Sequence, residues 1–147
     1  MTKKTLIVGS GFMGTSIALA LKSDGISCVE QNLDYLELLR NLNIYKNLYR
    51  SIDEVDKDFD LIIICSRQKE ALDHILNFSK KFPSAFITDI SSSKEFLIDS
   101  NLPRNFISSH PICGSHKTGP GNAESNLFLD KEVILIKGAE QELVDSI

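Results

Sequence analysis

Three glycines near the start of the chain have the spacing of a phosphate-binding turn. Gly9, Gly11 and Gly14 form G-x-G-x-x-G between the apolar run at residues 6–8 and a helical pattern. In such a turn the first glycine lets the chain bend off a strand, the second lets backbone approach a pyrophosphate, and the third lets helix and sheet pack closely. The N–H groups that begin the helix then face the phosphates. The motif alone is common, but this context favours a dinucleotide site, in which we expect Phe12 and Met13 to contact the cofactor as well.

An acidic residue lies where a dinucleotide-binding fold needs one. Glu30 directly follows the predicted strand at residues 26–29, about twenty residues beyond the glycines. A carboxylate there accepts hydrogen bonds from the adenosine ribose hydroxyls and repels a 2′-phosphate. Gln31 and Asn32 are neutral, so neither position offers an arginine that could bind such a phosphate. The sequence therefore predicts NAD rather than NADP, and the alternative is a solvated glutamate at a strand end.

Polar segments follow three further predicted strands. They are residues 65–68, 89–94 and 108–119, and the last is a long loop with two glycines. Ligands of open α/β sheets bind beyond the carboxyl ends of the strands. We expect Ser66, in the first segment, to line the nicotinamide ribose side. A loop as elaborate as the third segment indicates function rather than connection alone.

The elements that position these segments alternate between strand and helix patterns. The run at residues 60–65 is apolar without alternation, as in a parallel strand that is covered on both faces. This alternation predicts an α/β fold with a doubly wound, mostly parallel sheet of the Rossmann type, in which residues 1–147 form one dinucleotide-binding domain. Strands are predicted at residues 26–29, 48–50, 60–65, 85–89, 106–109 and 132–136, helices at 13–21, 33–42, 71–82 and 93–98, and a further helix beginning after 137–138.

Local signals predict how these helices end and which way they face. Gly25 is expected to take a left-handed conformation that stops the first helix, and Pro83 ends the third. His74 lies between polar neighbours on the third helix and is predicted to face solvent. The chain ends within a helical pattern, which indicates a boundary inside a longer protein, with a naturally short chain as the alternative.

Composition excludes several classes of function. The chain of 147 residues is 42% hydrophobic and 24% charged, and its net charge of −4 argues against a nucleic-acid partner. No apolar run has the length of a membrane span, and the first residues lead into a strand rather than a signal peptide. The three cysteines are far apart and odd in number, which indicates neither a disulfide framework nor a metal site. We therefore expect a cytoplasmic protein without a metal.

Several motifs together resemble the nucleotide-binding domain of prephenate dehydrogenases. These are the glycine turn, residues 89–94, the H-P-x-x-G segment from His110 to Gly114, and the N-L-F segment at 126–128 with the strand after it. The resemblance implies an NAD-dependent enzyme that oxidises and decarboxylates prephenate to 4-hydroxyphenylpyruvate in tyrosine biosynthesis, or a relative that acts on arogenate. It also implies a homodimer and a helical second domain, which we expect to lie outside this chain. The alternative from another class of function is a non-catalytic binding module that senses NAD, because it would share the glycine turn.

By this resemblance, His110 corresponds to the histidine that hydrogen-bonds the C4 hydroxyl of the substrate. Ser92 aligns with a serine that touches the same hydroxyl, although Ser92 and Glu95 also form an S-x-x-E capping box, which would occupy the hydroxyl with a backbone N–H. The chain departs from the family pattern at Arg67, Cys113 and His116. Lys117 keeps a basic position, either as a ligand contact or as a solvated lysine.

Overall fold

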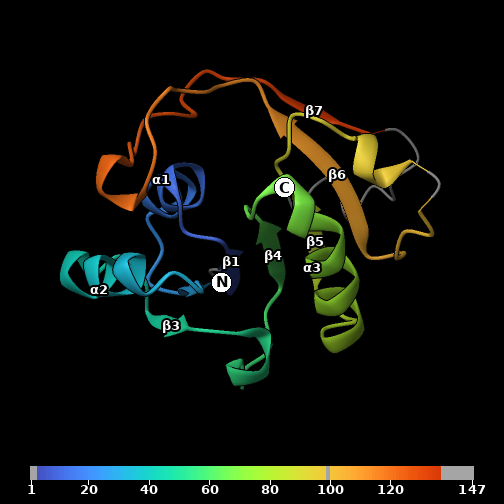
Figure 1. Cartoon of the computed structure of the whole chain (residues 1–147), viewed down its shortest axis with the longest axis horizontal. Coiled ribbons are helices and arrows are strands. Elements are labelled where there is room, and N and C mark those ends of the chain that lie inside the picture. The colour runs from blue at the N-terminus through green and yellow to red at the C-terminus, as the bar shows by residue number, and fades with distance from the viewer. Residues whose placement is uncertain (1–2, 99, 137–147) are drawn as a thin grey trace.

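The computed structural model describes residues 3–98 and 100–136, which form a seven-stranded sheet with helices on both faces (Figure 1). The strand order is β3-β2-β1-β4-β5-β6-β7, and every neighbouring pair is parallel except β6 and β7. The order reverses between β1 and β4, so the carboxyl ends of these two strands form the crevice where such sheets bind ligands. The strands are β1 (Thr5–Val8), β2 (Ile26–Val29), β3 (Asn47–Tyr49), β4 (Leu61–Ile64), β5 (Phe86–Asp89), β6 (Phe106–Pro111) and β7 (Val133–Leu135).

The central strands are buried on both faces, as their unbroken apolar sequences require. Successive side chains of a strand point to opposite faces of the sheet. Leu6 and Val8 therefore belong to one hydrophobic cluster, whereas Ile7 between them belongs to the other. The predicted doubly wound α/β sheet is thus confirmed, with a separate core on each face.

In the part of the chain that the structure describes, three α-helices cover the two faces of the sheet (Figure 1). Helices α1 (Phe12–Leu21) and α2 (Leu33–Leu42) lie on one face, and α3 (Gln68–Lys81) lies on the other. Helix α2 has the predicted bounds. The predicted stop of α1 at Gly25 is wrong, because Lys22 itself takes the left-handed conformation that ends the helix (φ 46°, ψ 40°).

The second half of the sheet is less regular than the first. In place of the predicted helix at residues 93–98, a single 3₁₀ turn, η2 (Glu95–Leu97), connects β5 and β6. Beyond β6, the chain returns across the carboxyl edge of the sheet, and η3 (Pro120–Asn122) packs against α1 and α2 before the chain reaches β7 (Figure 1). We call residues 112–132 the return loop. A further 3₁₀ turn, η1 (Ile52–Glu54), follows β3, and the predicted helix start at 137–138 lies outside the described residues.

Candidate active site

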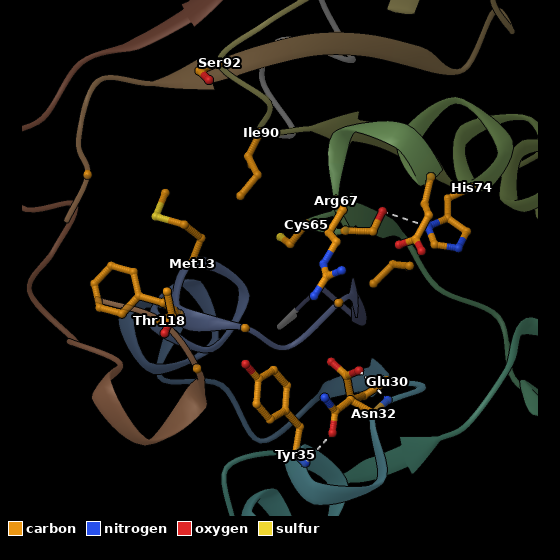
Figure 2. A pocket seen from close by; sticks show the side chains of 18 of the residues that line it. Met13, Glu30, Asn32, Tyr35, Cys65, Arg67, His74, Ile90, Ser92 and Thr118 are labelled. Atoms are coloured by element: carbon orange, nitrogen blue, oxygen red, sulfur yellow. Dashed lines mark hydrogen bonds between the residues drawn. The ribbon is translucent and has the colours of Figure 1, made fainter. Parts of the chain in front are cut away.

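A cleft of about 650 Å³ lies at the carboxyl ends of the strands. It is lined by the glycine turn, the end of β2, the start of α3, the loop after β5, the end of β6 and the return loop. In Figure 2, Glu30 and Ser92 lie at opposite ends of this cleft. The structure thus brings together most of the residues that the sequence singles out: Gly9, Gly11, Phe12, Met13, Glu30, Ser66, Ser92 and His110.

The glycine turn is packed so closely that two of its three glycines admit no side chain. A Cβ on Gly14 would lie 2.1 Å from the carbonyl oxygen of Gly9. Gly9 has φ +91°, and a Cβ there would lie 2.9 Å from the backbone nitrogen of Ser66. A Cβ on Gly11 would meet nothing within 4 Å, because this residue borders open space. Gly11 is also the N-cap of α1 without a side-chain cap, so the first N–H groups of the helix remain available to a ligand.

Glu30 is buried, and hydrogen bonds to the glycine turn fix its carboxylate. Oε2 accepts from the backbone N–H of Ser10 at 2.8 Å and from the Ser10 hydroxyl at 2.7 Å. Oε1 accepts from the backbone N–H of Asn32 at 2.8 Å. A carboxylate oxygen has two lone-pair directions, so Oε1 can accept one further hydrogen bond. Glu30 is therefore a fixed acceptor beside the turn and not a solvated strand-end glutamate.

His74 lies in the cleft, and the prediction that it faces solvent is wrong. Its Nδ1 is 2.7 Å from the hydroxyl of Ser66, and the ring is half-buried (Figure 2). Burial lowers the pKa of this imidazole, against the opposing effects of Glu70 and Asp73. A signal existed in the sequence: Arg67, Glu70 and His74 are spaced three and four apart, which places them on one helix face. All three line the cleft.

A buried carboxylate, Asp89, organises the opposite end of the cleft. Its oxygens accept from the Lys94 ammonium at 2.7 Å, from the Ser108 hydroxyl at 2.7 Å and from the backbone N–H of Ser91 at 3.1 Å. The same Lys94 ammonium donates to the carbonyl oxygen of Ser109 at 2.7 Å. Because Ser109 directly precedes His110, this ion pair fixes the strand that carries the histidine.

His110 and Ser92 both line the cleft near this network. Among the residues the structure describes, the Nδ1 of His110 has no hydrogen-bond partner, although this atom is buried. Buried polar atoms are nearly always paired, so this nitrogen calls for a partner. The capping-box interpretation of Ser92 is wrong: Lys94 is the N-cap of η2, and no side chain caps that turn. The segment is a loop in which the Lys94 ammonium contacts Asp89.

The return loop closes one side of the cleft. The Lys117 ammonium pairs with the Glu124 carboxylate, and the backbone N–H of Glu124 donates to the Ser16 hydroxyl on α1 at 2.9 Å. Lys117 thus lines the cleft as one member of an ion pair, whereas His116 is exposed. Burial raises the pKa of the Cys113 thiol, which makes it a poor nucleophile.

Within residues 3–98 and 100–136, no three His, Cys, Asp or Glu side chains are grouped so that they could hold a metal ion. No helix in those ranges is long and apolar enough to cross a membrane.

The amino-acid sequence matches one protein family along most of the chain. Residues 17–145 match the family described as "Prephenate dehydrogenase, nucleotide-binding domain". The chain belongs to this family. Prephenate dehydrogenase from Lactococcus lactis is 31% identical over 95% of the chain and 42% of its own length, and the enzyme from Bacillus subtilis is 28% identical over 97% and 41%.

Solved structures of prephenate dehydrogenase share the fold as well. The enzyme from Aquifex aeolicus superimposes with a TM-score of 0.88 at 28% identity, over 98% of this chain and 56% of the solved chain. A second structure of the same enzyme, in complex with hydroxyphenyl propionate and NAD+, gives 0.86 at 26% identity, over 99% and 55%. The chain thus spans less than half the length of these curated relatives and little more than half of the solved chains.

Proposed function

We propose that this chain is the nucleotide-binding domain of an enzyme that uses NAD to convert prephenate to 4-hydroxyphenylpyruvate and carbon dioxide. The observation that carries the proposal is the juxtaposition within one cleft of the glycine turn with Glu30 and of His110 with Ser92. A dinucleotide that is anchored by the first pair extends toward the second. The family and its NAD+-bound Aquifex aeolicus relative support this choice of cofactor.

The residues at the glycine end fit NAD. Gly11 leaves open space where a Cβ would be, and the uncapped start of α1 offers N–H groups to a pyrophosphate. Glu30 would accept a ribose hydroxyl, and its charge disfavours a 2′-phosphate. Phe12 and Met13 border the same space, and Ser66 lies where the cofactor would pass from the turn toward His110. When bound, NAD+ accepts the hydride that leaves C4 of the substrate.

His110 supplies the base in this proposal. As the hydride leaves C4, the hydroxyl oxygen on that carbon becomes a carbonyl and must lose its proton. A neutral imidazole takes this proton efficiently because its pKa lies near the operating pH. Loss of carbon dioxide then restores an aromatic ring, so the substrate supplies most of the driving force. Ser92 would hydrogen-bond the same hydroxyl, and positioning is the main task of the protein.

The remaining parts of the enzyme are proposed from the family resemblance. They are a helical domain that holds the substrate side chain and forms a homodimer, in a cytoplasmic enzyme. We therefore expect the isolated chain to bind NAD and to turn over prephenate poorly. Robust turnover by the 147 residues alone would contradict the need for a second domain.

Two measurements test the proposal. Calorimetric titration of the chain with NAD+ should show binding at one site. In the longest natural form of the protein, formation of NADH is then followed at 340 nm with prephenate and with arogenate. His110→Asn should lower the turnover number there about a hundredfold or more and leave NAD affinity nearly unchanged. Turnover of arogenate but not of prephenate would reassign the substrate. NAD binding without turnover of prephenate or arogenate would indicate an NAD sensor.

A further inference from the structure

The contact between His74 and Ser66 joins a helix side chain to the cofactor side of the cleft. Ser66 follows β4, and its backbone nitrogen lies against the glycine turn, 2.9 Å from where a Cβ of Gly9 would be. His74 lies two turns along α3, with Nδ1 2.7 Å from the Ser66 hydroxyl (Figure 2). The position of Ser66 is thus fixed by the turn, whereas the direction of its hydroxyl is left to His74.

The surroundings of His74 favour the neutral ring. The imidazole is half-buried and meets the Phe78 ring edge-on, with centroids 6.2 Å apart. This burial lowers its pKa below the usual value, although the carboxylates of Glu70 and Asp73 act in the opposite direction. A neutral imidazole has one nitrogen that accepts a hydrogen bond. In the neutral tautomer that carries its proton on Nε2, Nδ1 is that acceptor, so the Ser66 proton points at the ring and the oxygen lone pairs are free to face the cleft.

We propose that His74 is a positioning residue that fixes the Ser66 hydroxyl as an acceptor for a ribose hydroxyl of the bound dinucleotide. This inference rests on the proposed NAD binding. A serine without such a partner could present either its proton or its lone pairs to the ligand. His74 removes that choice, so the ligand does not have to orient the hydroxyl when it binds. In this proposal His74 acts on the cofactor through the Ser66 hydroxyl.

Three variants separate this role from simple packing. His74→Leu removes the acceptor and should raise the Kd for NAD+ about fivefold, the usual effect of one lost hydrogen bond. His74→Asn places an amide oxygen near the former Nδ1 and should restore most of the affinity. Asn77→Leu, an exposed change one turn further along α3, is the matched control and should leave the Kd unchanged.

A double-mutant cycle tests the path through Ser66. If His74 acts only by orienting the Ser66 hydroxyl, His74→Leu should have no further effect on the Kd in a Ser66→Ala background. Additive effects of the two changes would overturn the proposal, as would an unchanged Kd in His74→Leu. If the wild-type chain binds no NAD+, the proposed function itself fails, which is a different result.

The pH profile of binding gives a readout that packing alone would not move. Protonation of His74 makes Nδ1 a donor, which turns the Ser66 proton into the cleft. The Kd of the wild-type chain should therefore rise as the pH falls through the lowered pKa of His74, which lies below the ordinary imidazole value of about 6.5. His74→Asn cannot titrate and should show a flatter profile over the same range. Parallel profiles would overturn the proposal even if His74→Leu failed to fold.

Discussion

At the glycine end of the cleft the contacts are made by backbone, whereas at the His110 end they are made by side chains. Gly9 and Gly14 are held against backbone atoms of the turn itself and of Ser66. His110 lies in β6, the strand that is fixed by the Asp89–Lys94 ion pair, and its own Nδ1 has no partner among the described residues.

Because of this difference, the two ends of the cleft should tolerate different kinds of substitution. A Cβ added at Gly9 or Gly14 would lie 3.0 Å or less from backbone atoms, so the glycine end is constrained by volume. The His110 end is constrained by charge, because a buried carboxylate needs its cation. Changes in side-chain size should therefore be most damaging at the first end, and changes in charge at the second.

The largest effect is expected from Gly14→Ala. The added Cβ would meet the Gly9 carbonyl oxygen at 2.1 Å, so the backbone of the turn or α1 must move. We expect a loss of about 3 kcal/mol or more in the free energy of unfolding, measured by urea denaturation. Gly11→Ala is the matched control: its Cβ meets no protein atom, so it should weaken NAD+ binding while stability changes little. Equal destabilisation by both changes would contradict a constraint set by volume.

Removal of the cation at the other end should have the next largest effect. Lys94→Met keeps the length of the side chain but leaves the fully buried Asp89 without its ion pair. We expect a loss of about 3 kcal/mol in the free energy of unfolding. This value lies at the low end for a broken buried ion pair, because Asp89 keeps its other hydrogen bonds. Lys69→Met, at an exposed position on α3, provides the control. An Asp89→Asn change that rescued Lys94→Met would sharpen the assignment to charge.

A smaller effect is expected at Glu30, where both constraints meet. Glu30→Gln removes the charge and replaces one acceptor with a donor that faces either Ser10 or Asn32. The preference for NAD+ over NADP+ should fall about tenfold, the effect of losing one charge-assisted hydrogen bond. Calorimetric Kd values for both cofactors measure this ratio, with Glu37→Gln on the exposed face of α2 as the control. An unchanged ratio would show that Glu30 does not select the cofactor.

The smallest effect is a dependence of stability on pH through His74. Its pKa is lowered in the folded chain, so below the ordinary value of about 6.5 the unfolded chain binds the proton first. Stability should therefore be highest above that pH and should fall as the pH drops from there toward the folded-state pKa. Urea denaturation of the wild type and of His74→Asn should be compared at pH values between these two pKa values. The free energy of unfolding should fall more steeply with decreasing pH in the wild type.

The regular part of the fold could be predicted because its signals are local. Continuous apolar strands, the glycine turn and the helix at Leu33–Leu42 each follow from a short stretch of sequence. Two errors arose where a side chain just outside the helix or turn makes the deciding contact. Lys94 contacts Asp89 where the sequence predicted a capping box, and His74 contacts the Ser66 hydroxyl where the sequence predicted a surface residue. No pattern within η2 or α3 contains the partner that makes the difference.

The contact between Gly9 and Ser66 also bears on the order in which this chain folds. Strand β1 is paired on one side with β4. The first strand and its glycine turn therefore complete their contacts only with residues more than fifty positions away. Pairing between parallel strands so distant in sequence forms slowly, because the intervening chain must be ordered first. During synthesis, the contact between the glycine turn and Ser66 therefore cannot form until β4 and the residues after it have left the ribosome.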